Sequence, residues 1–165
     1  YTFSNNRSDF LDVFIASKAK FMICGDTGLN ELATIMRVPR AIVDFHQFSF
    51  LWQVNEAYTP IILPKKIYST KTKNYLSYID IFKKKYFDRD SRALIEGYEF
   101  VDNSEDEILN VTKEMVNLID KQNLDFDFER KKQSSFWNTY AKLYGSKSDM
   151  IISPTFFQKN NELFQ

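Results

Sequence analysis

The hydrophobic and polar positions of residues 20–45 follow the order of a strand, a turn, a helix and a second strand. Residues 21–24 are an apolar run of strand length, and the turn-forming sequence Gly25-Asp26-Thr27-Gly28 follows it. After this turn, apolar residues recur at helical spacing until Val38-Pro39, where proline ends the helix. Residues 41–43 are a second apolar run. This order predicts a βαβ unit with two parallel strands and a right-handed crossover.

A further helix is predicted directly ahead of this unit. Ser8 is suited to be the N-cap of a helix that runs to about Ala19, with Asp9 placed favourably against the helix dipole. The apolar residues of this segment form a wide stripe, so we expect the helix to be largely buried. The resulting αβαβ order predicts a Rossmann-like, doubly wound parallel sheet, with additional helices toward the C-terminus.

The rest of the chain predicts one more strand and several helices. An apolar run predicts a strand at residues 61–63, and apolar residues at helical spacing predict helices at 75–86 and 128–144. Capping residues predict two more helices: one behind the capping box of Ser104 and Glu107, and a terminal one that begins at Ser153-Pro154. The aromatic residues of 128–144 indicate core packing. We interpret the acidity of residues 96–130 as solvated helix surface. The lysines of residues 65–85 indicate a solvated helix end, with an anionic membrane surface or acidic glycan as the alternative.

Composition narrows the class of protein. The chain has 165 residues, of which 44% are hydrophobic and 16% aromatic, enough for a single domain with its own core. Acidic and basic residues balance at 22 each, so charge gives no argument for nucleic acid. One cysteine and one histidine exclude a disulfide framework and multi-cysteine or histidine-rich metal sites. No apolar stretch approaches membrane-spanning length, so we expect a cytoplasmic protein. The chain starts at Tyr1, and we expect it to be a piece of something longer.

The turn at residues 25–28 is the strongest candidate for chemistry. At the start of a helix, free N–H groups and the positive end of the dipole can bind a phosphate. Gly25 and Gly28 would allow a close approach, and Thr27 adds a hydroxyl donor. The alternative is a helix simply capped by Asp26 or Thr27. His46 follows the second strand at the same edge, either facing a ligand or as an ordinary surface or core histidine.

The sequence SDFLDVFIASKAKFMICGDTGLNELATIMRVPRAIVDF resembles the nucleotide-sugar-binding half of GT-B glycosyltransferases. It is similar in particular to a family of bacterial surface-polysaccharide glycosyltransferases, in an S-D-F-L-D helix, a K-F-x-I strand, a small-residue turn before G-L and an R-x-P ending. Similar motifs follow in LPKK, DNSEDEI, the Glu114-Met115 pair and ISPTFFQKN, so the resemblance extends with gaps over most of the chain. The D-[ST]-G turn is also similar to that of heptosyltransferase-like enzymes.

The resemblance implies roles for particular residues. The turn and the following helix would hold the donor diphosphate, through N–H or hydroxyl donors of Thr27, Gly28 and Leu29, with Asp26 orienting the turn. Asn30 or Glu31 would reach ribose or sugar hydroxyls. Arg7, Ser8 and His46 are weaker candidates for ligand contact. No cofactor or metal is expected, and no residue is nominated as the catalytic base.

The function implied is donor binding in bacterial surface glycan assembly. Residues 1–165 would form one Rossmann-like domain, the C-terminal part of a two-domain transferase of the hexosyltransferase type, which is not active without its N-terminal acceptor domain. The partners implied are a nucleotide sugar and a glycan or lipid-linked acceptor, in the cytoplasm or peripheral at the inner face of the membrane. Two alternatives stay open: a non-catalytic α/β binding or assembly module, and a small kinase-like phosphate-binding enzyme. The absence of a G-x-x-x-x-G-K-[ST] loop counts against the second.

Overall fold

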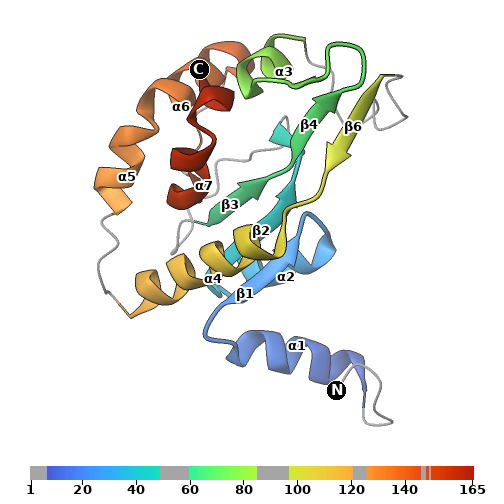
Figure 1. The fold of residues 1–165 in the computed structure, drawn as a ribbon. Helices are drawn as coiled ribbons and strands as arrows, with labels where there is room; N and C mark the ends of the chain where they lie inside the picture. Colours follow the sequence, from blue (N-terminus) through green and yellow to red (C-terminus); the bar gives the residue numbers. More distant parts are fainter. Residues whose placement is uncertain (1–6, 49–59, 85–96, 121–125, 146–147, 149) are drawn as a thin grey trace.

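A computed structural model describes residues 7–48, 60–84, 97–120, 126–145, 148 and 150–165. Its centre is a four-stranded parallel sheet flanked by helices (Figure 1). The strands lie in the order β1 (Met22–Gly25), β2 (Arg40–Phe45), β3 (Ile61–Pro64) and β7 (Ile151–Ile152). The predicted α/β class with a Rossmann-like parallel sheet is therefore confirmed. The strand order advances in one direction across the sheet.

The predicted helix, strand, helix and strand at the start of the chain are present. Helix α1 (Asp9–Lys18) begins at the N-cap Ser8, whose hydroxyl accepts a hydrogen bond from the Leu11 N–H at 3.2 Å. Strand β1, helix α2 (Gly28–Ile35) and strand β2 then form the expected βαβ unit, with β1 and β2 parallel.

The expectation that the first helix is largely buried is wrong. Of the side chains of α1, only Ala16 is buried, and the helix packs against α2 while most of its apolar stripe faces outward. In Figure 1, α1 lies at one end of the molecule, beyond β1. The predicted apolar residues are on the helix, but the described residues provide no surface on which most of them can pack.

A small antiparallel sheet was not predicted. It consists of β4 (Lys66–Ser69) between β5 (Asn74–Tyr75) and β6 (Tyr98–Val101). Only Lys65 separates β3 from β4, so the chain passes directly from one sheet into the other. The predicted helix at 75–86 begins three residues too early, because Tyr75 pairs with Tyr68 in the β5–β4 ladder and helix α3 spans Tyr78–Lys84.

The C-terminal half is mainly helical, as predicted. Its helices are α4 (Glu105–Ile119), α5 (Phe126–Lys132), α6 (Ser134–Tyr144), α7 (Pro154–Lys159) and the 3₁₀ helix η3 (Asn161–Phe164). The capping box of Ser104 and Glu107 and the Ser153 N-cap are confirmed. The single helix expected at 128–144 is wrong, because the helical residues are divided at Gln133 into α5 and α6. None of the described helices is long and apolar enough to span a membrane.

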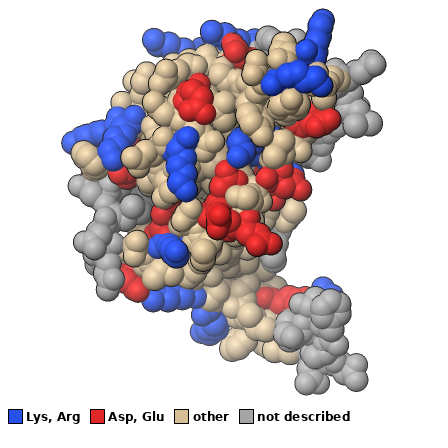
Figure 2. Space-filling view, viewed as in Figure 1, with Lys and Arg blue, Asp and Glu red and all other residues tan. Residues whose placement is uncertain are grey.

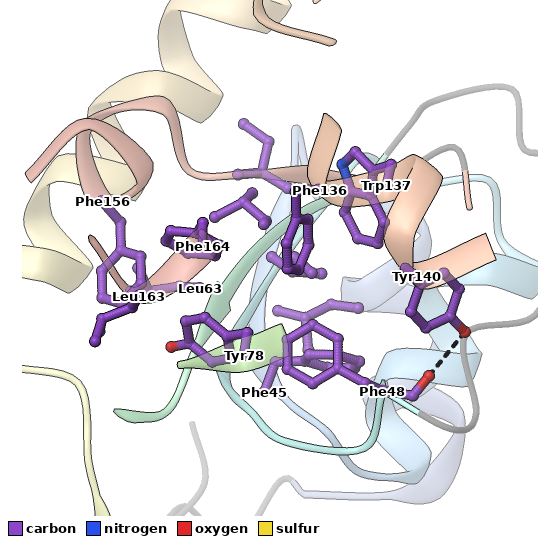
Figure 3. Packing of buried hydrophobic residues seen from close by; sticks show 14 of the residues in the cluster. Phe45, Phe48, Leu63, Tyr78, Phe136, Trp137, Tyr140, Phe156, Leu163 and Phe164 are labelled. Atoms are coloured by element: carbon purple, nitrogen blue, oxygen red, sulfur yellow. Dashed lines mark hydrogen bonds between the residues drawn. The ribbon is translucent and has the colours of Figure 1, made fainter. Parts of the chain in front are cut away.

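Aromatic side chains form the core between α3, α6 and the C-terminus (Figure 3). Tyr78 stacks on Phe164 with ring centroids 4.7 Å apart, and Phe82 lies 5.3 Å from Phe136. The Tyr140 hydroxyl donates a hydrogen bond to the Phe48 carbonyl at 2.9 Å, which fixes the segment that leaves β2. The aromatic stripe predicted in this region is therefore core.

Candidate functional site at the carboxyl edge of the parallel sheet

The first turn of the βαβ unit lies at the carboxyl end of β1. Thr27 is the N-cap of α2, but its side chain makes no capping hydrogen bond. The Thr27 N–H donates to the Gly25 carbonyl and the Asn30 N–H donates to the Thr27 carbonyl, both at 2.9 Å. The N–H groups of Gly28 and Leu29 open the helix, where no carbonyl of an earlier helical turn can accept from them. The turn thus presents helix-opening N–H donors and a hydroxyl that capping does not use.

The fold does not require either glycine of this turn. The chain contains four glycines, and two of them, Gly97 and Gly145, have φ of 93° and 72°, in the left-handed region that favours glycine. Gly25 and Gly28 are not in that region. A Cβ atom at Gly28 would meet nothing within 4 Å, and one at Gly25 would make only an ordinary 3.9 Å contact with Thr27. Local space and backbone conformation therefore leave these two glycines unexplained.

The other residues predicted for donor binding differ in their surroundings. Asp26 is half-buried and Glu31 is exposed on α2. Asn30 is 7% exposed, and its Oδ1 lies 4.0 Å from the Cys24 Sγ. Asn30 therefore packs beneath the helix, next to β1. Burial raises the pKa of the Cys24 thiol, with Arg40 acting in the opposite direction, so this cysteine is not an activated nucleophile.

His46 lies at the same edge of the sheet as the turn, because β1 and β2 are parallel and Gly25 pairs with Val43. Its Nδ1 lies 3.4 Å from the Asp44 carbonyl, and its ring meets Phe100 edge to face at 5.7 Å. The structure thus brings His46 and the turn to one edge of the sheet.

Arg7 and Ser8 have local partners instead. Ser8 caps α1, and the exposed Arg7 lies 3.5 Å from Asp12. These contacts account for both side chains at the start of α1, and they give no support for phosphate contact.

Asp44 and Asn103 form an element of this edge that the sequence reasoning missed. The Asp44 N–H donates to Asn103 Oδ1 at 2.7 Å, and the Asn103 N–H donates to Asp44 Oδ1 at 2.8 Å. Asn103 Nδ2 also donates to the Pro64 carbonyl at 3.0 Å. Asp44 has a φ of 52°, a left-handed conformation that asparagine and aspartate tolerate best. The pair joins the ends of β2 and β3 to the start of α4. Asp44, a polar residue directly after the apolar residues 41–43, was a sequence feature that could have indicated this contact.

Two ion pairs between lysine and carboxylate side chains lie next to the Asp44–Asn103 pair. Lys65 pairs with Asp102, and the largely buried Lys66 pairs with Glu107 at 2.9 Å. Burial acts to raise the pKa of Glu107, but hydrogen bonds from Ser104 and Lys66 outweigh it and lower that pKa. Figure 2 shows Asp and Glu side chains gathered over the start of α4, where Glu105 and Asp106 are exposed. For these two residues, the interpretation as solvated helix surface is confirmed.

No group of three or more His, Cys, Asp or Glu side chains in the described part of the chain is placed to hold a metal ion. Searches for similar proteins found no match to a protein-family model, a curated protein or a solved structure. The fold and the geometry of the carboxyl edge are therefore the basis for a functional proposal.

Proposed function

We propose that this chain is the donor-binding domain of a GT-B glycosyltransferase that acts in bacterial surface glycan assembly. The turn formed by Gly25, Asp26, Thr27 and Gly28 would hold the diphosphate of a nucleotide sugar. N–H groups of Gly28 and Leu29 would donate to phosphate oxygens, as at other helix N-termini that bind anions.

One observation carries this proposal: neither glycine of the turn is required by backbone conformation or by the space around it. A glycine permits an external group to approach the backbone closely. The Thr27 hydroxyl, which makes no capping hydrogen bond, supports the same interpretation. His46, at the neighbouring strand end, would face the sugar or the nucleotide.

In such a reaction the positive end of α2 would stabilise the negative charge that builds on the leaving nucleoside diphosphate. Asp26 would orient the turn and not contact phosphate, because a carboxylate repels it. The catalytic base and the acceptor site would come from an N-terminal acceptor domain of the same parent protein, and the acceptor would be a glycan or a lipid-linked sugar. The proposal carries with it a cytoplasmic setting, at the inner face of the membrane.

A thermal-shift screen tests the proposal. The chain is heated with UDP, GDP, CMP, ADP and the corresponding nucleotide sugars, since a ligand that binds the folded state raises the melting temperature as its concentration exceeds its Kd. We expect one nucleotide to give a selective shift that is lost in Thr27→Val and kept in Thr27→Ser. The complete gene product is screened in parallel, and no shift in either protein would contradict the proposal.

A further inference from the structure

Helix α1 has its apolar side turned away from the rest of the molecule. The exposed fractions are 73% for Phe10, 46% for Phe14, 47% for Ile15 and 39% for Val13, whereas Ala16 is buried. The rings of Phe10 and Phe14 stack with centroids 6.0 Å apart, so they form one continuous patch. Val13 lies on the same side of the helix as these rings, whereas Ile15 lies on another side. An exposed patch that combines two phenylalanines with a valine is typical of a surface that another element covers.

The connection from α1 to β1 has the form of the second half of a crossover. Three residues join α1 to β1, and four join α2 to β2. In a βαβ unit the helix returns from a strand that lies next to the following strand, and it packs across both of them. Helix α2 covers β1 and β2 in this way, and α1 lies against α2. By the same rule, α1 belongs over β1 and a strand on the outer side of β1.

No strand of the described residues occupies that position. β1 is the last strand at its end of the sheet, as Figure 1 shows. The Met22 N–H donates to the Pro39 carbonyl at 2.9 Å, so the backbone groups of Met22 point toward β2. Because successive residues of a strand point their backbone groups to opposite sides, those of Cys24 also point toward β2. The N–H and C=O of Ile23 therefore point to the open edge, and its side chain is 38% exposed.

The two edge strands of the sheet, β1 and β7, differ in whether a side chain bonds to their outward backbone groups. At β7, the Gln133 side chain bonds to both the N–H and the C=O of Ile152, which closes that edge. Among the described residues, β1 has no comparable side chain at Ile23. Natural proteins commonly cover, pair or charge the edge strands of their sheets.

We propose that the open edge of β1 takes up one more parallel strand, supplied by the same polypeptide on the N-terminal side of α1, and that Phe10, Val13 and Phe14 pack over it. The occupant is part of the same polypeptide because the strand and helix of a crossover follow each other along one chain. A second copy does not fit this position as well, since a twofold axis at β1 would pair the two strands antiparallel.

Thiol labelling tests the packing of α1. Val13→Cys places a reporter within the apolar patch, and Asn138→Cys places a matched one on the exposed side of α6. Both are made in the 165-residue chain and in the complete translation product of its gene, and a maleimide is the probe. The native Cys24 is buried and gives a slow background.

We expect Val13→Cys to react at least about 100-fold more slowly in the complete product than in the 165-residue chain, with Asn138→Cys unchanged. Hydrogen exchange of the Ile23 amide should slow in parallel. Equal labelling and exchange in both proteins would overturn the proposal. So would a gene product without further residues ahead of Tyr1, or protection that depends on protein concentration and therefore on a second copy. The measurements use no nucleotide, so they stand apart from donor binding.

Discussion

The side-chain amide of Gln133 forms with Ile152 the pair of hydrogen bonds that a neighbouring strand would form. Gln133 Nε2 donates to the Ile152 carbonyl at 2.7 Å, and the Ile152 N–H donates to Gln133 Oε1 at 2.9 Å. The same Oε1 accepts from the Trp137 indole N–H at 3.3 Å. Gln133 is fully buried and lies where α5 ends and α6 begins. It therefore ties the two helices to the edge of the sheet.

Gln133→Leu keeps the approximate volume and removes these hydrogen bonds. It leaves the N–H and C=O of Ile152 buried without these partners, so we expect the free energy of unfolding to fall by about 2–4 kcal/mol. Urea unfolding of the variant measures this loss. Gln158→Leu, on the exposed side of α7, is the matched control and should change stability by less than about 0.5 kcal/mol. Equal stability of the two variants would show that the edge needs no such cover.

Asn103→Ala should disconnect the strand ends from α4. The variant loses the side-chain bonds to the Asp44 N–H and the Pro64 carbonyl, and it leaves Asp44 in its left-handed conformation with less support. We expect a loss of about 2–3 kcal/mol in urea unfolding. Asn117→Ala, exposed on α4, serves as the control. A loss no greater than that of Asn117→Ala would mean that the Asp44–Asn103 pair does not stabilise the edge.

The raised pKa of the buried Glu114 should make the free energy of unfolding depend on pH. Burial raises the pKa of its carboxyl group, against the effect of the Thr155 N–H, which donates to it at 2.8 Å. The folded state then holds the Glu114 proton more tightly than the unfolded state. The contribution of Glu114 to the free energy of unfolding is therefore greatest below the ordinary pKa of a glutamate and decreases as the pH rises through the raised pKa.

Urea unfolding of wild type and Glu114→Gln between about pH 4 and pH 8 measures this contribution. We expect the stability of Glu114→Gln relative to wild type to increase with pH across that range. The exposed Glu162→Gln should show no such trend. A difference that does not change with pH, or one that decreases, would contradict the raised pKa.

Gly28→Ala separates stability from binding. Because a Cβ at Gly28 meets nothing within 4 Å, we expect stability to be unchanged or to rise by about 0.5–1 kcal/mol. If a phosphate approaches the backbone there, nucleotide affinity should fall at least about tenfold. Gly145→Ala is the contrasting control, since its φ of 72° makes alanine strained and should lower stability by about 1 kcal/mol. Nucleotide affinity that survives Gly28→Ala would move the site away from this turn.

The parts of the fold that the sequence predicted are those with strong local signals. The βαβ unit, the Ser8 and Ser104 caps and the Gly145 stop each follow from residues within one turn or strand. The antiparallel sheet was missed because β4, β5 and β6 are short and are defined by pairing between distant residues. The division at Gln133 was missed because it depends on a contact with β7.

In the candidate site, too, features with a local sequence signal were predicted and features that depend on distant contacts were not. The turn at residues 25–28 was predicted from its composition and its place between a strand and a helix. The burial of Asn30 and the contact of Asp44 with Asn103 depend on tertiary packing. The local sequence pattern does not predict such packing. For the same reason the apolar stripe of α1 was recognised, and its outward orientation was not.

Calorimetric titration of a nucleoside diphosphate into wild type, Thr27→Val and Thr27→Ser tests the central claim most directly. The titrant is the nucleotide that the thermal-shift screen selects, and the complete gene product is titrated beside the 165-residue chain. We predict that Thr27→Val weakens binding about tenfold or more, because it removes a hydroxyl donor from the turn, and that Thr27→Ser binds nearly as wild type. Equal affinity of wild type and Thr27→Val in the complete gene product, or no binding to it at all, would contradict the proposal that this turn holds the donor diphosphate.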